Sequence, residues 1–475
     1  MSLAAPASTS VPAVAPTLHR PPAQVPLKER FFYGLGAVAY GIKDNGFSVF
    51  LLIYLNQMIG LDPGRVGITL LVVLVLDAMF DPVVGHWTDA TRSRWGRRHP
   101  FLYASAIPIA LFWVLLWIPP SGEGWAPYLW VFFCALAVRM SLSLNEVPSL
   151  AMLPEMTSDP HERTEVVGWR FMLGWLGGLI TLGLAYGFFK LIPIDEASQA
   201  SYHAYAMTGA AVMFVSVLAA AMGTHRRYAR PVPATTAHPS IGDMIGCARY
   251  RPFRILVLAM VFAFASQGVT FAITNYVLGY VWQLTSAGLL AYAVLLGVGV
   301  ALGLYLARAL GRRVGKRRTA MTMVLITPFI GAAPFLLFLL GELPDALTIE
   351  RAAVVFLFAA LSTGTGVAGL LTAQSMMADV TTAYRVETGR AREGVFFAGQ
   401  LFIQKCVGGL GIFIVGQMLV LVGFPAGAVK GAVAREVLSG LVVAYGTVTL
   451  MLGMLAAYFL SRFPLDERII APVQE

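Results

Sequence analysis

The residues best placed to do chemistry in this chain are charged ones that lie inside long apolar runs. Asp77 and Asp81 are four residues apart, so on a helix they share one face. Two ionised carboxylates one turn apart repel each other, and either a sodium ion between them or a shared proton relieves that repulsion. Because hard cations take oxygen ligands, Glu146, Ser143 or Asn145 could complete the shell. We therefore expect a cation site, with both aspartates as metal ligands if the cation is sodium.

A second group of charges suits a polar solute. A charged side chain at the centre of a membrane helix costs at least about 2.5–3.5 kcal/mol, so such residues usually serve a function. Lysine and arginine donate hydrogen bonds to hydroxyl or anionic groups, whereas carboxylates accept them. The candidate substrate-binding residues are Lys43, Asp44, Arg139, Glu146, Arg170 and Lys405. Structural ion pairs between helices are the alternative, and for Arg139 both interpretations remain open.

The elements that must position these charges are membrane-spanning helices. The chain is 57% hydrophobic and 12% charged, whereas soluble domains carry about 25% charged residues. Its apolar runs are about 20 residues or longer, enough to cross a bilayer as helices, whereas barrel strands have about 10 residues. We predict an all-α polytopic membrane protein with twelve spans, near 31–58, 66–88, 100–118, 126–153, 164–190, 205–223, 254–281, 286–309, 318–340, 350–373, 394–423 and 437–461.

The spans divide into two sets of six. The longest polar interval, 224–253, lies between the sixth and seventh spans, and two equal halves joined by a basic loop are typical of major facilitators. The predicted division is a disordered cytoplasmic tail at 1–29, a six-helix bundle at 30–223, a cytoplasmic loop at 224–253, a second six-helix bundle at 254–462 and a cytoplasmic tail at 463–475.

The basic residues predict the orientation. Of the 34 lysines and arginines, 25 fall in the tails and in loops on one side, and five fall in loops on the other. Because cytoplasmic loops carry the excess of positive charge, both termini should be cytoplasmic, in a bacterial inner membrane. This distribution accounts for the net charge of +9 without a nucleic-acid partner.

The loops after the second and eighth spans carry matching basic clusters. The first contains Trp95-Gly96-Arg97-Arg98, and the second contains Val314-Gly315-Lys316-Arg317. Basic residues around a glycine turn, at the same place in each half, indicate a duplicated unit.

Several segments resemble the glycoside–pentoside–hexuronide cation symporters, the family of the melibiose carrier, over about residues 30–460. They are Tyr33-Gly-Leu-Gly-Ala37, Asp77-Ala-Met-Phe-Asp81-Pro82 with the Thr91–Arg97 continuation, Glu146-Val-Pro148 with Leu153-Pro154, and Ala378-Asp379 with Thr388–Gly394.

The resemblance implies a major facilitator fold and a role for each matching residue. It assigns the cation to Asp77 and Asp81, and places Lys405 close to both sites. It assigns sugar contacts to Lys43, Asp44, Glu146 and Arg170. It implies a cytoplasmic gate built from Asp89, Arg92, Arg94, Gly96, Arg97 and Arg98, and from Gly315, Lys316 and Arg317 in the second half.

Departures from the family pattern bear on both the coupling cation and the transported solute. Phe80 replaces an asparagine, which removes one oxygen ligand and favours a proton over sodium. Leu150 and Leu370 stand where aromatic platforms are expected, Glu146 replaces an aspartate, and Arg139 is an additional charge. The resemblance thus implies cation-coupled symport of a glycoside, uronide or related sugar-like solute, other than melibiose itself.

The sequence is also compatible with a carrier of another solute, but it argues against an enzyme and a nucleotide-driven pump. A cation-coupled lysophospholipid carrier would keep similar acids in the second span, and leucines at the platform positions suit an acyl chain. An enzyme would need a nucleophile–base pair or a metal cluster, and a pump would need a nucleotide-binding loop; neither pattern is present. We expect a monomeric carrier with a small-molecule solute, a lipid bilayer around it and no cofactor besides the coupling ion.

Overall fold

The structure is a computed structural model that describes residues 24–122, 124–157, 159–191, 199–229, 246, 249–342, 349–389 and 393–464. Most of the predicted tails and of the predicted central loop therefore lie outside the described residues.

Helices account for all twelve predicted spans. The first span is a run of short segments, α1 (Leu27–Leu35), α2 (Val38–Asn45), η1 (Gly46–Phe50), α3 (Leu51–Ile53) and η2 (Tyr54–Met58), in which η denotes π-helical turns. The rest of the first half is α4 (Pro63–Ala90), α5 (His99–Leu116), α6 (Ala126–Met156), α7 (Pro160–Leu191) and α8 (Gln199–Tyr228).

The second half repeats this pattern of long helices. Its elements are α10 (Arg251–Tyr276) with η4 (Val277–Val281), α11 (Ser286–Val314), α12 (Lys316–Leu340), α13 (Ile349–Thr388), α14 (Glu393–Leu421) and α15 (Arg435–Ser461). Within the described ranges, eleven helices are long and apolar enough to cross a membrane, and the segmented run at 27–58 supplies the twelfth span. The prediction of an all-helical polytopic membrane protein is confirmed.

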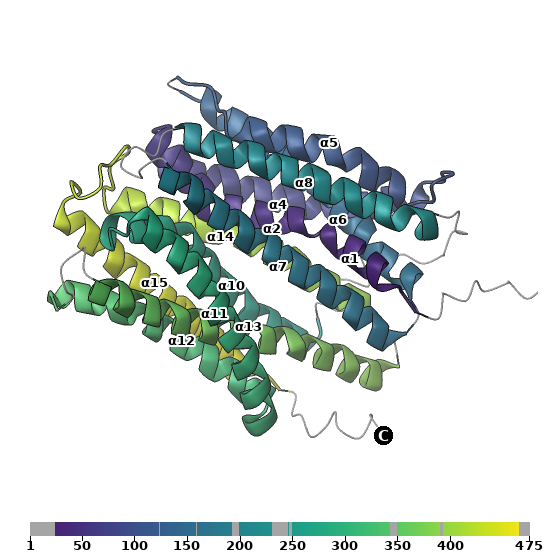
Figure 1. The fold of residues 1–475 in the computed structure, drawn as a ribbon. Coiled ribbons are helices and arrows are strands. Elements are labelled where there is room, and N and C mark those ends of the chain that lie inside the picture. Colours follow the sequence, from purple (N-terminus) through teal and green to yellow (C-terminus); the bar gives the residue numbers. More distant parts are fainter. Residues whose placement is uncertain are drawn as a thin grey trace, which may run out of the picture.

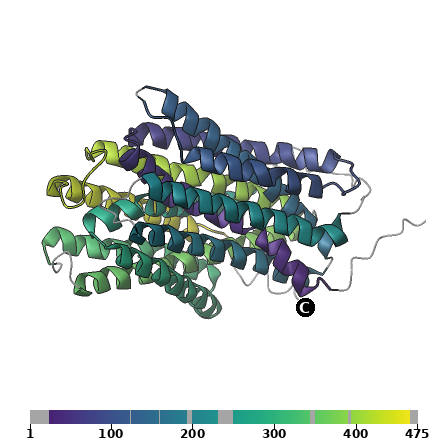
Figure 2. The same ribbon diagram turned by 45° about the horizontal axis from the view of Figure 1, so that its top comes forward.

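The helices form one elongated bundle, in which both halves place their helices roughly along one axis (Figure 1). We call the end that holds Leu27 and Ser461 the terminal end, and the opposite end, with the 422–434 loop, the distal end. Helix α4 of the first half packs along α14 of the second. The turned view shows the same elongated arrangement (Figure 2).

In the part of the chain that the structure describes, the core shared by the two halves lies toward the distal end. One buried apolar cluster there joins first-half residues such as Tyr54 and Val66 to second-half residues such as Tyr276 and Val415. Toward the terminal end, separate clusters lie around Met156 in the first half and around Phe396 in the second. The halves are therefore packed together at one end and have cores of their own at the other.

Hydrogen bonds between the halves reinforce the distal end. Tyr276 donates to Asn56 at 3.1 Å, and Tyr280 donates to Gln57 at 3.2 Å. The Gln57 side chain also accepts from the Ala428 amide at 2.8 Å. These bonds satisfy buried polar groups that would otherwise weaken the interface.

The two basic loops turn at glycines with a left-handed backbone. Gly96, between α4 and α5, has φ of 74°, and Gly315, between α11 and α12, has φ of 86°. Glycine adopts this region without the penalty that a Cβ atom would impose. The matched turns predicted for the two halves are present.

Candidate functional site

Charged residues from four helices, α2, α4, α6 and α14, meet between the two halves. Helix α6 presents Arg139, Ser143 and Glu146 on one face because their spacings of four and three match the helical repeat. Helix α4 presents Asp77 and Asp81. The cavity between these helices is lined by Tyr40, Lys43, Asp77, Arg139, Leu142, Ser143, Glu146 and Lys405, and Asp81 forms an ion pair with Lys405.

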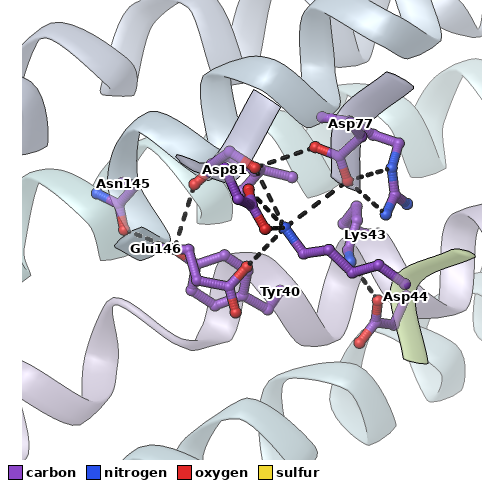
Figure 3. A network of polar contacts seen from close by, with 11 residues as sticks. Tyr40, Lys43, Asp44, Asp77, Asp81, Asn145 and Glu146 are labelled. Carbon is purple, nitrogen blue, oxygen red and sulfur yellow. Dashed lines mark hydrogen bonds and ion pairs between the residues drawn. The ribbon is translucent and has the colours of Figure 1, made fainter. Parts of the chain in front are cut away.

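Lys405 is the centre of this network and joins the two halves. Its Nζ lies 2.7 and 3.0 Å from the carboxylate oxygens of Asp81. The same nitrogen is 3.7 Å from Asp77 and 3.6 Å from Glu146. Figure 3 shows the side chains of Asp77, Asp81 and Glu146 converging on this point. One ammonium group thus balances carboxylates from both predicted sites.

Asp77 is the most deeply buried acid of the group, with a side chain 2% exposed. The Arg139 guanidinium donates to the Asp77 Oδ2 atom through Nε at 3.0 Å, and its Nη2 lies 2.8 Å from the same oxygen. The Ser143 hydroxyl donates to the other oxygen at 3.0 Å. Arg139 therefore forms an ion pair with a predicted cation ligand.

Arg170 occupies a separate aromatic recess in the first half. It donates to the Ser149 hydroxyl at 2.8 Å and lies over the rings of Tyr33 and Tyr40, 5.7 and 5.1 Å from their centroids. Its Nη2 is buried and has no hydrogen-bond partner within the described part of the chain. An unpaired donor on a buried cation suits an acceptor supplied by a ligand.

Lys43 and Asp44 form an ion pair with each other. The Lys43 side chain is 11% exposed and lines the cavity, whereas Asp44 is 67% exposed. Tyr40, one turn earlier on the same helix, donates to Asn145 at 3.0 Å. The predicted substrate residues of the first half therefore lie on α2, α6 and α7. Lys43, Arg139 and Glu146 line the cavity, whereas Asp44 is exposed and Arg170 lies in its own recess.

Phe80 turns its ring against Trp87, with the centroids 5.7 Å apart and nearly perpendicular. It therefore contributes packing along α4 where the family pattern has an amide. The acid Asp81 beside it has Lys405 as its partner.

The predicted gate residues brace the terminal end within each half. Arg98 pairs with Asp89 at 2.6 Å, and Arg97 pairs with Glu155 of α6 at 2.7 Å. In the second half, Lys316 pairs with Asp379 of α13 at 2.8 Å. Of the remaining gate residues, Arg94 lies over the Trp95 ring, Arg317 donates to the Ser461 carbonyl, and Arg92 is exposed.

Sequence reasoning missed several partners. Tyr40 could have been found, since it precedes Lys43 by three residues and shares its helical face. Ser149, Phe47 and Glu155 carry no local signal that distinguishes them, because each gains its role from a contact with a distant helix.

Comparison with known proteins identifies the family. The profile of the family described as MFS/sugar transport protein matches residues 32–467, nearly the whole chain. The chain belongs to this family. Its fold and family are those of transporters.

Relatives and solved structures agree with that membership. The isoprimeverose transporter of Lactiplantibacillus pentosus is 24% identical over 95% of this chain and 92% of its own length. The inner membrane symporter YicJ of Escherichia coli K12 is 25% identical over 84% of each chain. A bacterial homologue of the human lysosomal transporter Spinster, solved in an inward-facing, unoccupied conformation, superposes with a TM-score of 0.65 at 14% identity, over 93% of this chain and 98% of that one. The last comparison shows the shared major facilitator fold.

Proposed function

We propose that this chain is a symporter that couples a monovalent cation to the uptake of a glycoside, a uronide or a related sugar-like solute, which it leaves chemically unchanged. The observation that carries the proposal is the position of Lys405. One ammonium group lies within 3.7 Å of both predicted cation carboxylates and of Glu146 in the predicted sugar site. A change of charge at one site therefore changes how strongly Lys405 interacts with the carboxylates of the other site. Such an energetic link between two sites is the physical requirement for coupling.

The solute class follows from the donors and acceptors around the cavity. Tyr40, Lys43 and Glu146 offer both donors and acceptors for sugar hydroxyls. The unpaired nitrogen of Arg170 suits a carboxylate or a further hydroxyl. The relative named as an isoprimeverose transporter supports a glycoside as the first candidate.

Alternating access explains how the two halves would use one site. The shared distal core and the separate terminal cores correspond to a state that is closed distally. With both termini in the cytoplasm of a bacterium, this state is inward-facing. We propose that the protein works as a monomer in the inner membrane and needs no cofactor besides its coupling ion. The halves rock about the midplane site, as in other carriers of this fold.

The test is solute-dependent ion flux in proteoliposomes that hold the purified protein with a pH dye or a sodium dye. Isoprimeverose, p-nitrophenyl glucuronide and lysophosphatidylcholine are added in turn. An ion flux evoked by isoprimeverose or by the glucuronide, and absent from protein-free vesicles, supports the proposal. A response to lysophosphatidylcholine alone would replace the sugar with a lysolipid, and the absence of any response would contradict symport of these solutes.

A further inference from the structure

We infer that Arg139 is a tethered cation that occupies the place beside Asp77 where sodium would bind, so that this chain transports without sodium. The inference rests on the proposed function and deepens it by identifying the residue that selects the coupling ion. The family resemblance implies a cation site at Asp77 and Asp81, and the geometry around both acids argues that sodium does not fit there.

The oxygens of Asp77 are already occupied. Two nitrogens of Arg139 lie 3.0 and 2.8 Å from its Oδ2 atom, and the Ser143 hydroxyl donates to its Oδ1 atom at 3.0 Å. A hard cation needs several oxygen ligands at once. A sodium ion bound to this carboxylate would lie beside the guanidinium charge, and it would have to displace the guanidinium to use the Oδ2 atom.

Arg139 is held where it is. Its side chain is 5% exposed, and its guanidinium carbon lies 5.4 Å from the centroid of the Phe47 ring. The guanidinium does not lose its proton in proteins. If sodium took Asp77, Arg139 would remain a buried charge without its partner, which is strongly unfavourable.

The position beside Asp81 is no better for sodium. Both carboxylate oxygens of Asp81 accept hydrogen bonds from Lys405, and Lys405 also bonds the Ser143 hydroxyl at 3.2 Å. The neighbouring Phe80 brings a hydrocarbon ring where an amide oxygen would complete a shell. The two acids therefore face two side-chain cations, and Arg139 is the one without a counterpart in the family pattern.

The test is equilibrium binding of radioactive sodium to the purified full chain in detergent, with no solute added. Wild-type protein is expected to show no saturable binding. Arg139→Ala and the bulkier Arg139→Gln remove the tethered charge and should each create one saturable site, with at least tenfold more bound sodium. Arg139→Lys keeps the charge and should remain sodium-free, and Arg139→Ala combined with Asp77→Asn should lose the new site.

Saturable sodium binding by the wild-type chain would overturn the inference, and this result does not depend on any variant folding. So would a neutral variant that elutes as a monodisperse peak and still binds no sodium. A failure of the symport proposal can be distinguished from a failure of the sodium-exclusion inference. Vesicles that transport no sugar would refute symport and leave the binding result intact, whereas sugar uptake that requires sodium would refute sodium exclusion and leave symport intact.

Discussion

At the scale of single residues, Asp81 is the acid whose neutralisation tests most directly whether transport is coupled to a cation. Its partner Lys405 reaches it across the interface between the halves. Asp81→Asn keeps the shape of the side chain but removes its charge, so Lys405 loses its nearest counter-ion and a coupling cation loses a carboxylate. We expect concentrative uptake of isoprimeverose to fall at least tenfold, whereas exchange of labelled for unlabelled sugar persists.

The matched control for that variant is Asp62→Asn at the start of α4. The Asp62 side chain caps this helix by accepting from the Arg65 amide, and asparagine caps equally well. Uptake should be unchanged in this control. Full concentrative uptake by the Asp81 variant would remove Asp81 from the coupling machinery.

Arg170 provides a residue-scale test of the solute class. Hydrogen bonds to charged groups contribute about 1.5–3 kcal/mol, so Arg170→Gln should weaken competition by p-nitrophenyl glucuronide about tenfold or more. Competition by a neutral glycoside should change much less, since its hydroxyls also bond the glutamine. The exposed Arg254, changed to glutamine, serves as the control. Equal losses for both solutes would show that Arg170 does not recognise the acidic group.

At the scale of helices, the sequence predicted positions well and contacts poorly. The apolar runs predicted every span, because length and hydropathy are local properties. They did not predict that α13 extends to Thr388, fifteen residues past the predicted end at 373. That extension is polar, and it brings Asp379 to Lys316 of a helix 63 residues earlier.

In the candidate site too, the sequence predicted the positions of residues better than their contacts. The buried charges could be identified from their positions within apolar runs, and Asp77 and Asp81 from their helical spacing. The pairing of Arg139 with Asp77 and of Lys405 with Asp81 spans 62 and 324 residues. No local pattern encodes such pairings, which depend on the way in which α4, α6 and α14 pack.

Glycines allow α2 to approach α7 closely enough to position Lys43. A Cβ atom on Gly41 would collide with the backbone of Gly174 and Gly178, and the Asn45 amide donates to the Gly178 carbonyl at 2.6 Å. Overpacking of this kind costs about 1–3 kcal/mol, so Gly41→Ala should lower the thermal midpoint by several degrees in detergent, measured by tryptophan fluorescence. Gly446→Ala on α15 meets nothing within 4 Å and should leave the midpoint unchanged. Identical midpoints for the two variants would contradict the close approach.

The chain before α1 is fastened to the start of α7 by Glu162. This carboxylate accepts from the Val25 amide and from Arg30, and Val25 is 2% exposed. Glu162→Ala should release this segment together with the first turn of α1, and should speed tryptic cleavage after Lys28 at least fivefold, as measured by mass spectrometry. Glu165→Ala is the control, because Glu165 is 63% exposed and such surface pairs contribute little. Equal cleavage rates would show that Glu162 does not fasten the segment.

The same contact has a defined pH dependence. Burial raises the pKa of Glu162, but hydrogen bonds from Thr157, the Val25 amide and Arg30 outweigh it and lower the pKa below its ordinary value. A lowered pKa in the folded state means that the stabilisation is complete above the unfolded pKa and is lost as the pH falls through the folded value. The wild-type cleavage rate, corrected for trypsin activity, should therefore be constant from about pH 6 to 8.

At the scale of the whole molecule, the distal interface determines which side of the site is closed. Gln57 contributes three hydrogen bonds between the halves, to the Pro425 carbonyl, the Tyr280 hydroxyl and the Ala428 amide. Because each bond contributes about 0.5–1.5 kcal/mol, Gln57→Ala should shift the equilibrium toward a distally open state.

Spin labels at Ile118 and Val429 would measure this shift, since both positions are exposed at the distal end, one on each half. The native cysteines are first replaced by serine. Gln57→Ala should add or enlarge a longer-distance population in the double electron–electron resonance spectrum. Thr69→Ala should not, because the Thr69 hydroxyl bonds the Arg65 carbonyl of its own helix. An unchanged distance distribution in the Gln57 variant would mean that the shared apolar core, rather than these hydrogen bonds, holds the distal end closed.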